Sequence, residues 1–485
     1  MRKSAIAGSL VVSIVVIVAI TFVMSSVTDS GSEAAAKLIV WVTFTGAIVV
    51  VVLTALRCRE ATRLLHPLVA PVAYLVYALL VPLIYISLTG QGIQTMPSSM
   101  LNSQTAVAMS LVIIMYCVGA RLSMGGRVAG NRSTASDLQL VSPYDAAVSL
   151  VTRDFGRLVL FLALAARVYE WLVDGAISSR VYGANQLAYT TDTAISILGE
   201  SLVAVGCLLV MRGNTLALGR PLTAIDKVLV ISICGISLFI LGSRAEMIAP
   251  LVLYLWFWLK CGRRIPVGRV VVAAAIVAAA FLAVAQFRSR SAGPPGYPLI
   301  ENLLVETSSP LYITDSLIQL VPQQYDFFGG ATYLESLKFM FPGVISRAMF
   351  GDVQGTGALV YRHLIGFTFE GNGWGFALPA EAYLNFGFVG IAVVAFLVGL
   401  LFGRSYQQSG RVASVINLSG YLYPLLLSYL PYGLRSDALG ELKSIVYPLA
   451  ICGFVLVFSR SLVRKPPLPC PASAAIESQG RGEGR

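Results

Sequence analysis

The sequence predicts an all-α, polytopic integral membrane protein, and composition and segment length are the observations behind this prediction. Of its 485 residues, 56% are apolar and 12% are charged, about half the charged share of an ordinary soluble domain. The apolar residues form blocks close to the roughly 20 residues that a helix needs to cross a bilayer. Each block must be helical, because an open strand would leave backbone groups unpaired in lipid. A large soluble enzyme, a disordered chain and a disulfide-rich secreted scaffold are excluded.

About twelve membrane spans can be drawn along the chain. The first follows Met-Arg-Lys as a signal peptide would, but its apolar run exceeds the 7–15 residues of a signal core, so we expect a retained helix. The predicted spans are Ala5–Met24, Leu38–Leu56, Leu68–Leu88, Ala106–Ala120, Leu158–Val173, Ala194–Met211, Val228–Leu241, Met247–Leu259, Val270–Ala285, Phe386–Phe402, Val412–Leu430 and Ser444–Phe458.

Lysine and arginine give the predicted orientation. With the N-terminus inside, alternate loops hold clustered positive charge, whereas most early intervening loops are nearly uncharged or mildly acidic. Because positively charged loops stay on the cytoplasmic side, both termini are predicted to be cytoplasmic. The net charge of +11 is then a topology signal, and we expect no nucleic-acid partner.

One loop between predicted spans is far longer than usual connections. Residues 287–385 separate the ninth and tenth spans and form a large extracytoplasmic loop. Residues 1–286 hold the first nine spans and a polar cytoplasmic connector at 121–157, and residues 386–459 hold the last three. The tail, 460–485, is rich in proline and then in glycine and charged residues, which predicts disorder.

The large loop carries two helix signals. Ser309-Pro310 is a cap followed by proline in the first turn, and it predicts a helix over Leu311–Val321 that Pro322 ends. A second helix is predicted over Ala331–Phe341, with an apolar face opposite an acid and a lysine. Such a helix suits the membrane interface; packing over the transmembrane bundle is the alternative.

Arginines on the outer side are unexpected, since the orientation rule predicts few of them. Arg244 lies in a tight hairpin between two spans, and Arg288 and Arg290 emerge from the next outward helix. The planar guanidinium gives phosphate two parallel, charge-assisted hydrogen bonds, so these residues predict recognition of phosphate or pyrophosphate at headgroup depth. The alternatives are anchoring to lipid headgroups or an ion pair of Arg244 with Glu246.

Two charged residues lie inside the fifth predicted span. Arg167 and Glu170 are three residues apart and therefore share a helical face. Charges within a span are costly and usually face a cavity or a partner. Either the two neutralise each other near the outer end, or they line a polar site.

The end of the large loop combines glycines with polar residues. Gly371–Gly375, which includes Trp374, permits a tight turn that brings the backbone close to a ligand. Pro379 starts the following helix, and Glu381 and Asn385 share one of its faces. Glu381 is a candidate base or a partner for an arginine, although a turn re-entering the membrane explains the glycines equally well.

His363 is the only imidazole of the outer loop and hence a candidate general base, although a lone loop histidine is more often structural. No metal or cofactor is expected. The chain has no Cys/His ligand spacing, P-loop, dinucleotide fingerprint or Gly-x-Ser-x-Gly, and its first outer loop lacks the paired acids of metal-dependent lipid-linked glycosyltransferases. Energy for a reaction would then have to come from the substrate.

Three stretches resemble one known family. They are the hairpin Gly242-Ser243-Arg244-Ala245-Glu246, the Phe287-Arg288-Ser289-Arg290 opening of the large loop, and its end from Gly371 through Glu381–Gly390. Together they resemble the O-antigen or oligosaccharide repeat-unit polymerases of the Wzy type. The resemblance is best from Val228 to Leu401; before that it rests on topology alone.

The resemblance implies a membrane glycosyltransferase that acts without nucleotide or metal. It transfers a glycan from undecaprenyl pyrophosphate to a fresh lipid-linked unit on the outer face of the membrane, making O-antigen or exopolysaccharide. The implied partners are this lipid-linked donor and acceptor, membrane lipid, a chain-length regulator and a flippase. The expected catalytic residues are Arg244, Arg288, Glu381 and His363, with Glu381 ranked above His363 and Glu246 as the base. The residues expected to bind substrate are Arg290, Arg167, Glu246, Asn385 and Trp374.

Two other functions are open. An O-antigen ligase has the same architecture, but His363 lies in no matching motif. A repeat-unit transporter or flippase is the second alternative. Transporters tend to show internal repeats and charges at mid-bilayer, whereas this chain has no detectable repeat and only Glu170 as such an acid.

Overall fold

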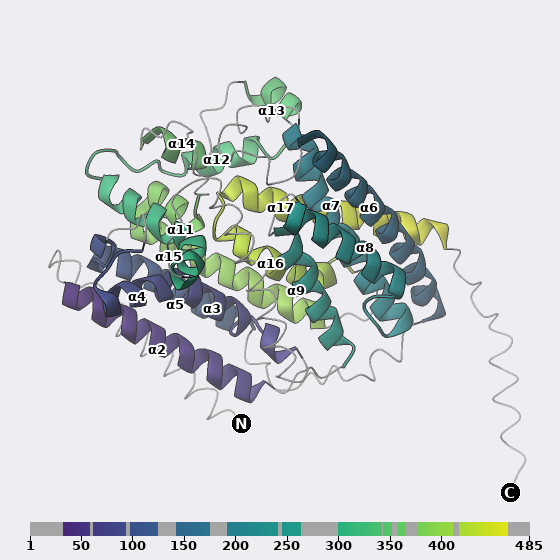
Figure 1. Cartoon of the computed structure of the whole chain (residues 1–485), viewed down its shortest axis with the longest axis horizontal. Coiled ribbons are helices and arrows are strands. Elements are labelled where there is room, and N and C mark those ends of the chain that lie inside the picture. Colours follow the sequence, from purple (N-terminus) through teal and green to yellow (C-terminus); the bar gives the residue numbers. More distant parts are fainter. Residues whose placement is uncertain are drawn as a thin grey trace, which may run out of the picture.

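The computed structural model is a bundle of helices around a shared core (Figure 1). The part of the chain that the structure describes contains no β-strand, so the predicted all-α class is confirmed there. The structure describes residues 33–58, 62–93, 98–124, 142–174, 192–240, 245–262, 299–341, 343–351, 357–364, 376–410 and 417–463.

Within the described residues, six stretches of helix are long and apolar enough to cross a membrane, as expected of a polytopic membrane protein. They are Glu33–Leu56, Ala70–Thr89, Ser103–Met124, Ser201–Leu218, Leu378–Ser409 and Ala438–Leu462. Each predicted span within the described residues coincides with helix over most of its length; Ala5–Met24 and Val270–Ala285 lie outside those residues. The helices are α2 (Glu33–Arg57), α3 (Ala70–Leu75), η2 (Val76–Leu80), α4 (Val81–Thr89), α5 (Ser103–Met124), α6 (Pro143–Asp174), α7 (Asp192–Leu218), α8 (Ala224–Gly235), η7 (Ile236–Ile240), α9 (Ala245–Lys260), α11 (Leu299–Leu320), α12 (Ala331–Lys338), α13 (Gly343–Phe350), α14 (Gly357–Leu364), α15 (Leu378–Gly410), α16 (Ser419–Gly433) and α17 (Ala438–Leu462), besides two short 3₁₀ turns.

Two helix pairs, α5 with α15 and α6 with α7, have backbones in direct contact. A Cβ atom on Gly119 of α5 would collide with the carbonyl oxygen of Phe396, and one on Gly399 of α15 with that of Tyr116. Small residues allow such close approach, which drives helix association in lipid, where burial of apolar surface does not. Glycine thereby fixes α5 against α15, the helix that carries Glu381.

The connector predicted at 121–157 is shorter than expected. Helix α6 begins at Pro143 and runs without a break to Asp174. The Ser142 hydroxyl accepts a hydrogen bond from the backbone N–H of Asp145 at 3.0 Å and donates to the Asp145 carboxylate at 2.7 Å. This reciprocal cap, followed by proline at the first helical position, is a known helix start. The sequence therefore carried a signal for the longer helix.

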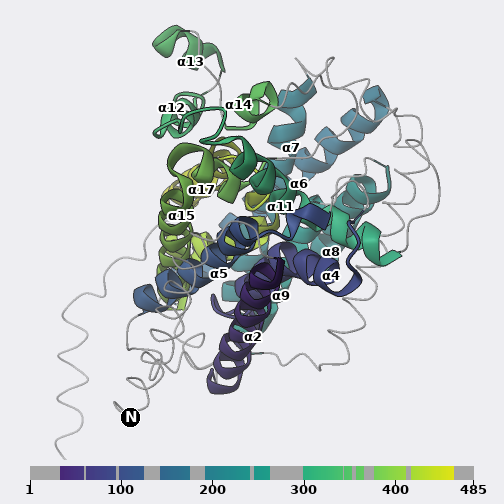
Figure 2. The same ribbon diagram turned by 90° about the vertical axis from the view of Figure 1, so that its left-hand side faces the viewer.

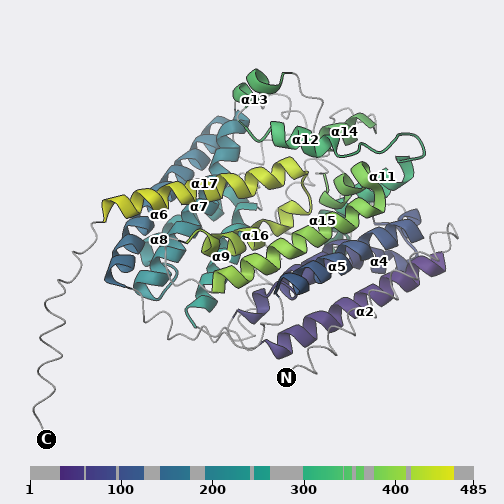
Figure 3. The same ribbon diagram turned by 180° about the vertical axis from the view of Figure 1, so that it is seen from behind.

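Of the helices of the large loop, α12, α13 and α14 lie on one side of the bundle, where α12 contacts α15 and α17, whereas α11 packs against α15, η2 and α5 (Figures 2 and 3). The predicted start of the first one was wrong, because α11 begins at Leu299 and contains Pro310. A proline inside a helix removes one backbone hydrogen bond, and the buried Leu304 and Leu311, on either side of it, pack this helix into the core. Its end at Leu320 lies one residue before the predicted Val321.

Helix α12 begins at Ala331, where the second loop helix was predicted to begin, and ends at Lys338, three residues before the predicted Phe341. It packs on the bundle through its polar side, where Thr332, Glu335 and Ser336 are buried. Its apolar side is uncovered, with Leu334 62% and Leu337 50% exposed. The helix therefore lies over the bundle, as one alternative predicted, and contact of its uncovered apolar side with a membrane interface stays a prediction.

Candidate functional site

Glu381 lies in the first turn of α15 and is fully buried. One carboxylate oxygen accepts a hydrogen bond from the Thr332 hydroxyl at 2.7 Å, and the other accepts one from the backbone N–H of Ala438 at 2.6 Å. These donors come from α12 and from the first residue of α17. Glu381 thus ties a helix of the large loop and the start of the last helix to α15.

Asn385, one turn further along α15, completes the connection to α12. Its side-chain amide donates to the Thr332 hydroxyl at 2.7 Å and to the backbone oxygen of Glu381 at 2.8 Å, and its side-chain oxygen accepts from the N–H of Gly330 at 3.0 Å. The prediction that Glu381 and Asn385 share a face is confirmed, because both contact Thr332. We call Glu381, Asn385, Thr332 and the N–H of Ala438 the Glu381 cluster.

A kink in α15 lets this helix accept the loop backbone. Phe386 and Gly387 have non-helical dihedrals, with φ of +62° at Gly387, a value that glycine adopts without strain. The preceding carbonyls then bind the loop: those of Leu384 and Asn385 accept from the N–H groups of Phe328 and Gly329, each at 3.1 Å.

The start of α17 adds partial positive charge opposite Glu381. The side chain of Asp437 caps this helix by accepting from the N–H of Gly440 at 2.9 Å. The N–H of Ala438 is left for Glu381, and the positive end of a helix dipole stabilises a carboxylate in that position. Neither residue was predicted as part of a site, although Ser436-Asp437 ahead of a helical run is a capping pattern.

Tyr333 places a hydroxyl beside the cluster. That hydroxyl is buried and has no hydrogen-bond partner among the residues whose side chains are described. Burial and the nearby charge of Glu381 raise the pKa of Tyr333 above its ordinary value. The ring stacks against Phe386, with centroids 6.4 Å apart. A buried donor without a partner is costly, so a substrate oxygen arriving here would gain a hydrogen bond.

The other predicted site residues lie apart from the cluster or outside the described residues. His363 is exposed on α14, although the start of that helix, Gly357, abuts the Glu381 carboxylate. Arg167 is buried, forms an ion pair with Glu170 and packs against Gly199 of α7, in agreement with the mutual-neutralisation alternative. Five of the predicted site residues have side chains that the structure does not describe: Arg244, Glu246, Arg288, Arg290 and Trp374.

Comparison with known protein families identifies the family of this chain. The family model of the O-antigen polysaccharide polymerase Wzy matches residues 9–465. The chain belongs to the Wzy family. Comparison with curated proteins and with solved structures gave no match. The Wzy match takes in both the helical bundle and the large loop, so the resemblance predicted from three short stretches is confirmed over nearly the whole chain.

Sequence patterns identified only those members of the Glu381 cluster that α15 carries, Glu381 and Asn385. In the sequence, Thr332 is 49 residues and Ala438 is 57 residues away from Glu381. No local sequence pattern therefore predicts either contact. Among the residues that the structure describes, no group of three or more His, Cys, Asp or Glu side chains is placed to hold a metal ion.

Proposed function

We propose that the protein polymerises undecaprenyl-pyrophosphate-linked oligosaccharide repeat units into O-antigen or exopolysaccharide on the outer face of the cytoplasmic membrane. Membership of the Wzy family is the observation that carries this proposal. In the proposed topology about twelve spans cross the membrane, both termini are cytoplasmic, and residues 287–385 form the outward loop. A chain-length regulator and a flippase are proposed partners.

The proposed reaction is a glycosyl transfer that needs neither metal nor nucleotide. A hydroxyl at the non-reducing end of a fresh lipid-linked unit attacks the anomeric carbon of the growing glycan. The bond between that carbon and the pyrophosphate oxygen breaks, undecaprenyl pyrophosphate leaves, and the hydroxyl proton passes to a base. The leaving group itself supplies the driving force.

Arginines of the outer side are proposed to bind the pyrophosphate. Arg244 and Arg288 would stabilise the negative charge that grows on the leaving group, and Arg290 would hold the donor. Preorganised cations aimed at developing charge are often the largest catalytic contribution, and arginine suits phosphate geometry. Trp374 is a proposed further contact of the sugar chain.

Glu381 is proposed as the base, ahead of His363 and Glu246. Its carboxylate lies under Thr332 and against Gly357, at the junction of the loop with the bundle. In the described arrangement each carboxylate oxygen accepts one hydrogen bond and keeps a further lone pair that can take the proton of the acceptor hydroxyl. Asn385 is proposed to orient Thr332, and the Tyr333 hydroxyl to bind an acceptor oxygen.

The test is polymerisation by the purified protein in lipid, supplied with a synthetic undecaprenyl-pyrophosphate repeat unit. We expect a ladder of products that forms equally well in excess EDTA and that Arg244→Ala abolishes without loss of expression or insertion. Arg404→Ala, on the predicted cytoplasmic side, is the matched control and should polymerise normally. A ladder that requires a lipid A-core acceptor would indicate a ligase, and transbilayer movement of the unit without bond formation would indicate a flippase; either result would overturn the proposal.

A further inference from the structure

Two carboxylates accept hydrogen bonds from the start of α17. Asp437 is the N-cap residue, with extended backbone (φ −82°, ψ 171°), and its side chain accepts from the N–H of Gly440 at 2.9 Å. The N–H of Ala438 donates instead to the Glu381 carboxylate at 2.6 Å. The first four N–H groups of a helix have no partner within that helix, so each carboxylate satisfies a different one of these donors.

The backbone of Asp437 determines where the N–H of Ala438 points. The two residues share one peptide group, which is planar, so the dihedral ψ of Asp437 sets the direction of this N–H. The hydrogen bond from Gly440 to the Asp437 side chain holds the extended backbone that an N-cap residue adopts. Because helix ends fray, this cap is what keeps the Ala438 N–H directed at Glu381.

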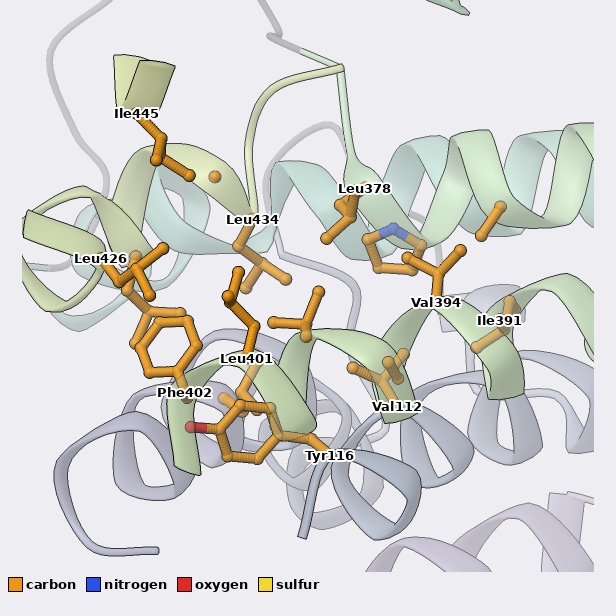
Figure 4. A pocket seen from close by; sticks show the side chains of 17 residues that line it. Val112, Tyr116, Leu378, Ile391, Val394, Leu401, Phe402, Leu426, Leu434 and Ile445 are labelled. Atoms are coloured by element: carbon orange, nitrogen blue, oxygen red, sulfur yellow. The ribbon is translucent and has the colours of Figure 1, made fainter. Parts of the chain in front are cut away.

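Apolar packing between the starts of α15 and α17 is incomplete. Leu378 at the start of α15, Leu434 after α16 and Ile445 of α17 line one cavity (Figure 4), and its volume is about 90 Å³. Side chains that line a cavity lose van der Waals contacts on that side, so packing there constrains the two helix starts weakly. The hydrogen bond between Ala438 and Glu381 therefore contributes strongly to their alignment.

The two oxygens of Glu381 are held from different helices. One accepts from the Thr332 hydroxyl of α12, which Asn385 holds in turn, and the other accepts from Ala438. If the contact with Ala438 is lost, the carboxylate can rotate about its remaining hydrogen bond. A base whose direction is set by a neighbouring group is the arrangement found in catalytic triads.

We propose that Asp437 is a positioning residue for polymerisation. By capping α17 it directs the N–H of Ala438 at Glu381, and it thereby holds this carboxylate in the orientation that accepts the proton of the acceptor hydroxyl. The inference rests on the proposed function for the role of Glu381 as the base. Asp437 acts as a hydrogen-bond acceptor, so an uncharged acceptor of the same length should replace it.

The experiment compares three variants of the full-length protein in nanodiscs. Asp437→Ala removes the cap, whereas Asp437→Asn keeps it and removes only the charge, because asparagine caps helices as well as aspartate does. Ser142→Ala is the matched control, since it removes the cap of α6 on the predicted cytoplasmic side. Initial rates of ladder formation from the synthetic repeat unit give kcat and KM, and the melting temperature reports stability.

We expect kcat of Asp437→Ala to fall about tenfold with KM unchanged, because the cap acts on the base and not on substrate binding. Asp437→Asn should keep kcat within about twofold of the wild type. Ser142→Ala should lower the melting temperature as Asp437→Ala does and leave kcat per folded molecule unchanged. The inference is overturned if Ser142→Ala loses as much kcat as Asp437→Ala, or if Asp437→Asn does.

Hydrogen exchange without substrate separates this inference from the proposed function. Mass spectrometry with electron-transfer fragmentation follows the Ala438 N–H, whose exchange, corrected for its intrinsic rate, should be about tenfold faster in Asp437→Ala and near the wild-type rate in Asp437→Asn. If Asp437→Ala leaves this exchange unchanged while the wild type builds ladders, the inference fails and the function stands. If exchange changes as expected but the wild type builds no ladder from any lipid-linked unit, the proposed function fails and the contact that Asp437 holds stands.

Discussion

Among the buried carboxylates that connect the described helices, Asp226 and Glu381 are stabilised in different ways. Asp226, at the start of α8, accepts hydrogen bonds from Arg157 Nε at 2.7 Å, Asn214 Nδ2 at 2.8 Å and Thr223 Oγ1 at 2.6 Å. Burial alone would raise the pKa of Asp226, but the hydrogen bonds, first of all that from Arg157, outweigh it and lower the pKa. This carboxylate is a permanently charged link between α6, α7 and α8.

Glu381 is equally buried, and among the described residues its carboxylate accepts hydrogen bonds from uncharged donors, the Thr332 hydroxyl and the N–H of Ala438. None of the ion pairs between described side chains includes it. A carboxylate removed from water without a cation is costly. Asp226 is therefore neutralised by Arg157, whereas the described side chains supply no cation for Glu381. Glu381 can still take up a proton or bind a positive charge, which suits a site that binds and releases substrate.

The largest expected effect is on activity, and it is tested by replacing the carboxylate of each acid with the corresponding amide. Glu381→Gln should lower polymerisation about 100-fold or more, the range for loss of a general base, with a melting temperature near that of the wild type. Asp226→Asn is the matched control and should retain its rate per folded molecule. The measurement is ladder formation from the synthetic repeat unit. Equal activity of the two variants would contradict the distinction.

Thr332→Val tests whether Glu381 acts as a base or by positioning α12. Valine keeps the shape of threonine and removes the hydroxyl. If Glu381 is the base, this variant should lose about tenfold at most, far less than Glu381→Gln. Similar losses in both variants, with an unchanged dependence of the rate on pH, would indicate that Glu381 only holds the loop.

The next largest effect is on stability. Asp226→Asn should destabilise the fold by roughly 3 kcal/mol, because it removes the buried carboxylate that pairs with Arg157 and leaves that guanidinium the exposed Asp154. Since the pKa of Asp226 is lowered in the folded state, its stabilising effect is present above the ordinary aspartate pKa and is lost as the pH falls through the lowered value. The difference in melting temperature between wild type and variant should therefore shrink in acid. A constant difference at every pH would refute this explanation.

The parts of the fold that rest on local pattern were predictable from sequence. Apolar blocks located the helices, and the spacing of Glu381 and Asn385 placed them on one face, because both signals act within a few turns. The start of α11 was missed because tertiary packing carries the helix through Pro310. The partners of Glu381 were missed for a related reason, since the contacts with Thr332 and Ala438 depend on how α12 and α17 pack.

A smaller effect is expected from close packing of α5 against α15. Gly399→Ala inserts a methyl group against the backbone of Tyr116 and should cost about 1–3 kcal/mol. Gly453→Ala is its matched control, because a Cβ atom there meets open space. Thermal unfolding in detergent compares the two. Equal melting temperatures would show that α5 and α15 can accommodate the methyl group without a loss of stability.

The smallest effect concerns α12, which Glu381 holds through Thr332. A nitroxide at Leu337→Cys should contact oxygen dissolved in lipid, whereas one at Lys338→Cys should contact an aqueous nickel reagent, because the exposed Leu337 belongs to the apolar side of an interface helix. Accessible cysteines are first replaced by serine. If Glu381 positions α12, the Leu337 label becomes more mobile in the Glu381→Gln background and stays unchanged with Asp226→Asn, since the hydrogen bonds of Asp226 to described residues join it to α6, α7 and the start of α8. A label that loosens equally in both backgrounds would mean that α12 responds to general destabilisation, and the distinction between the two acids would then rest on catalysis alone.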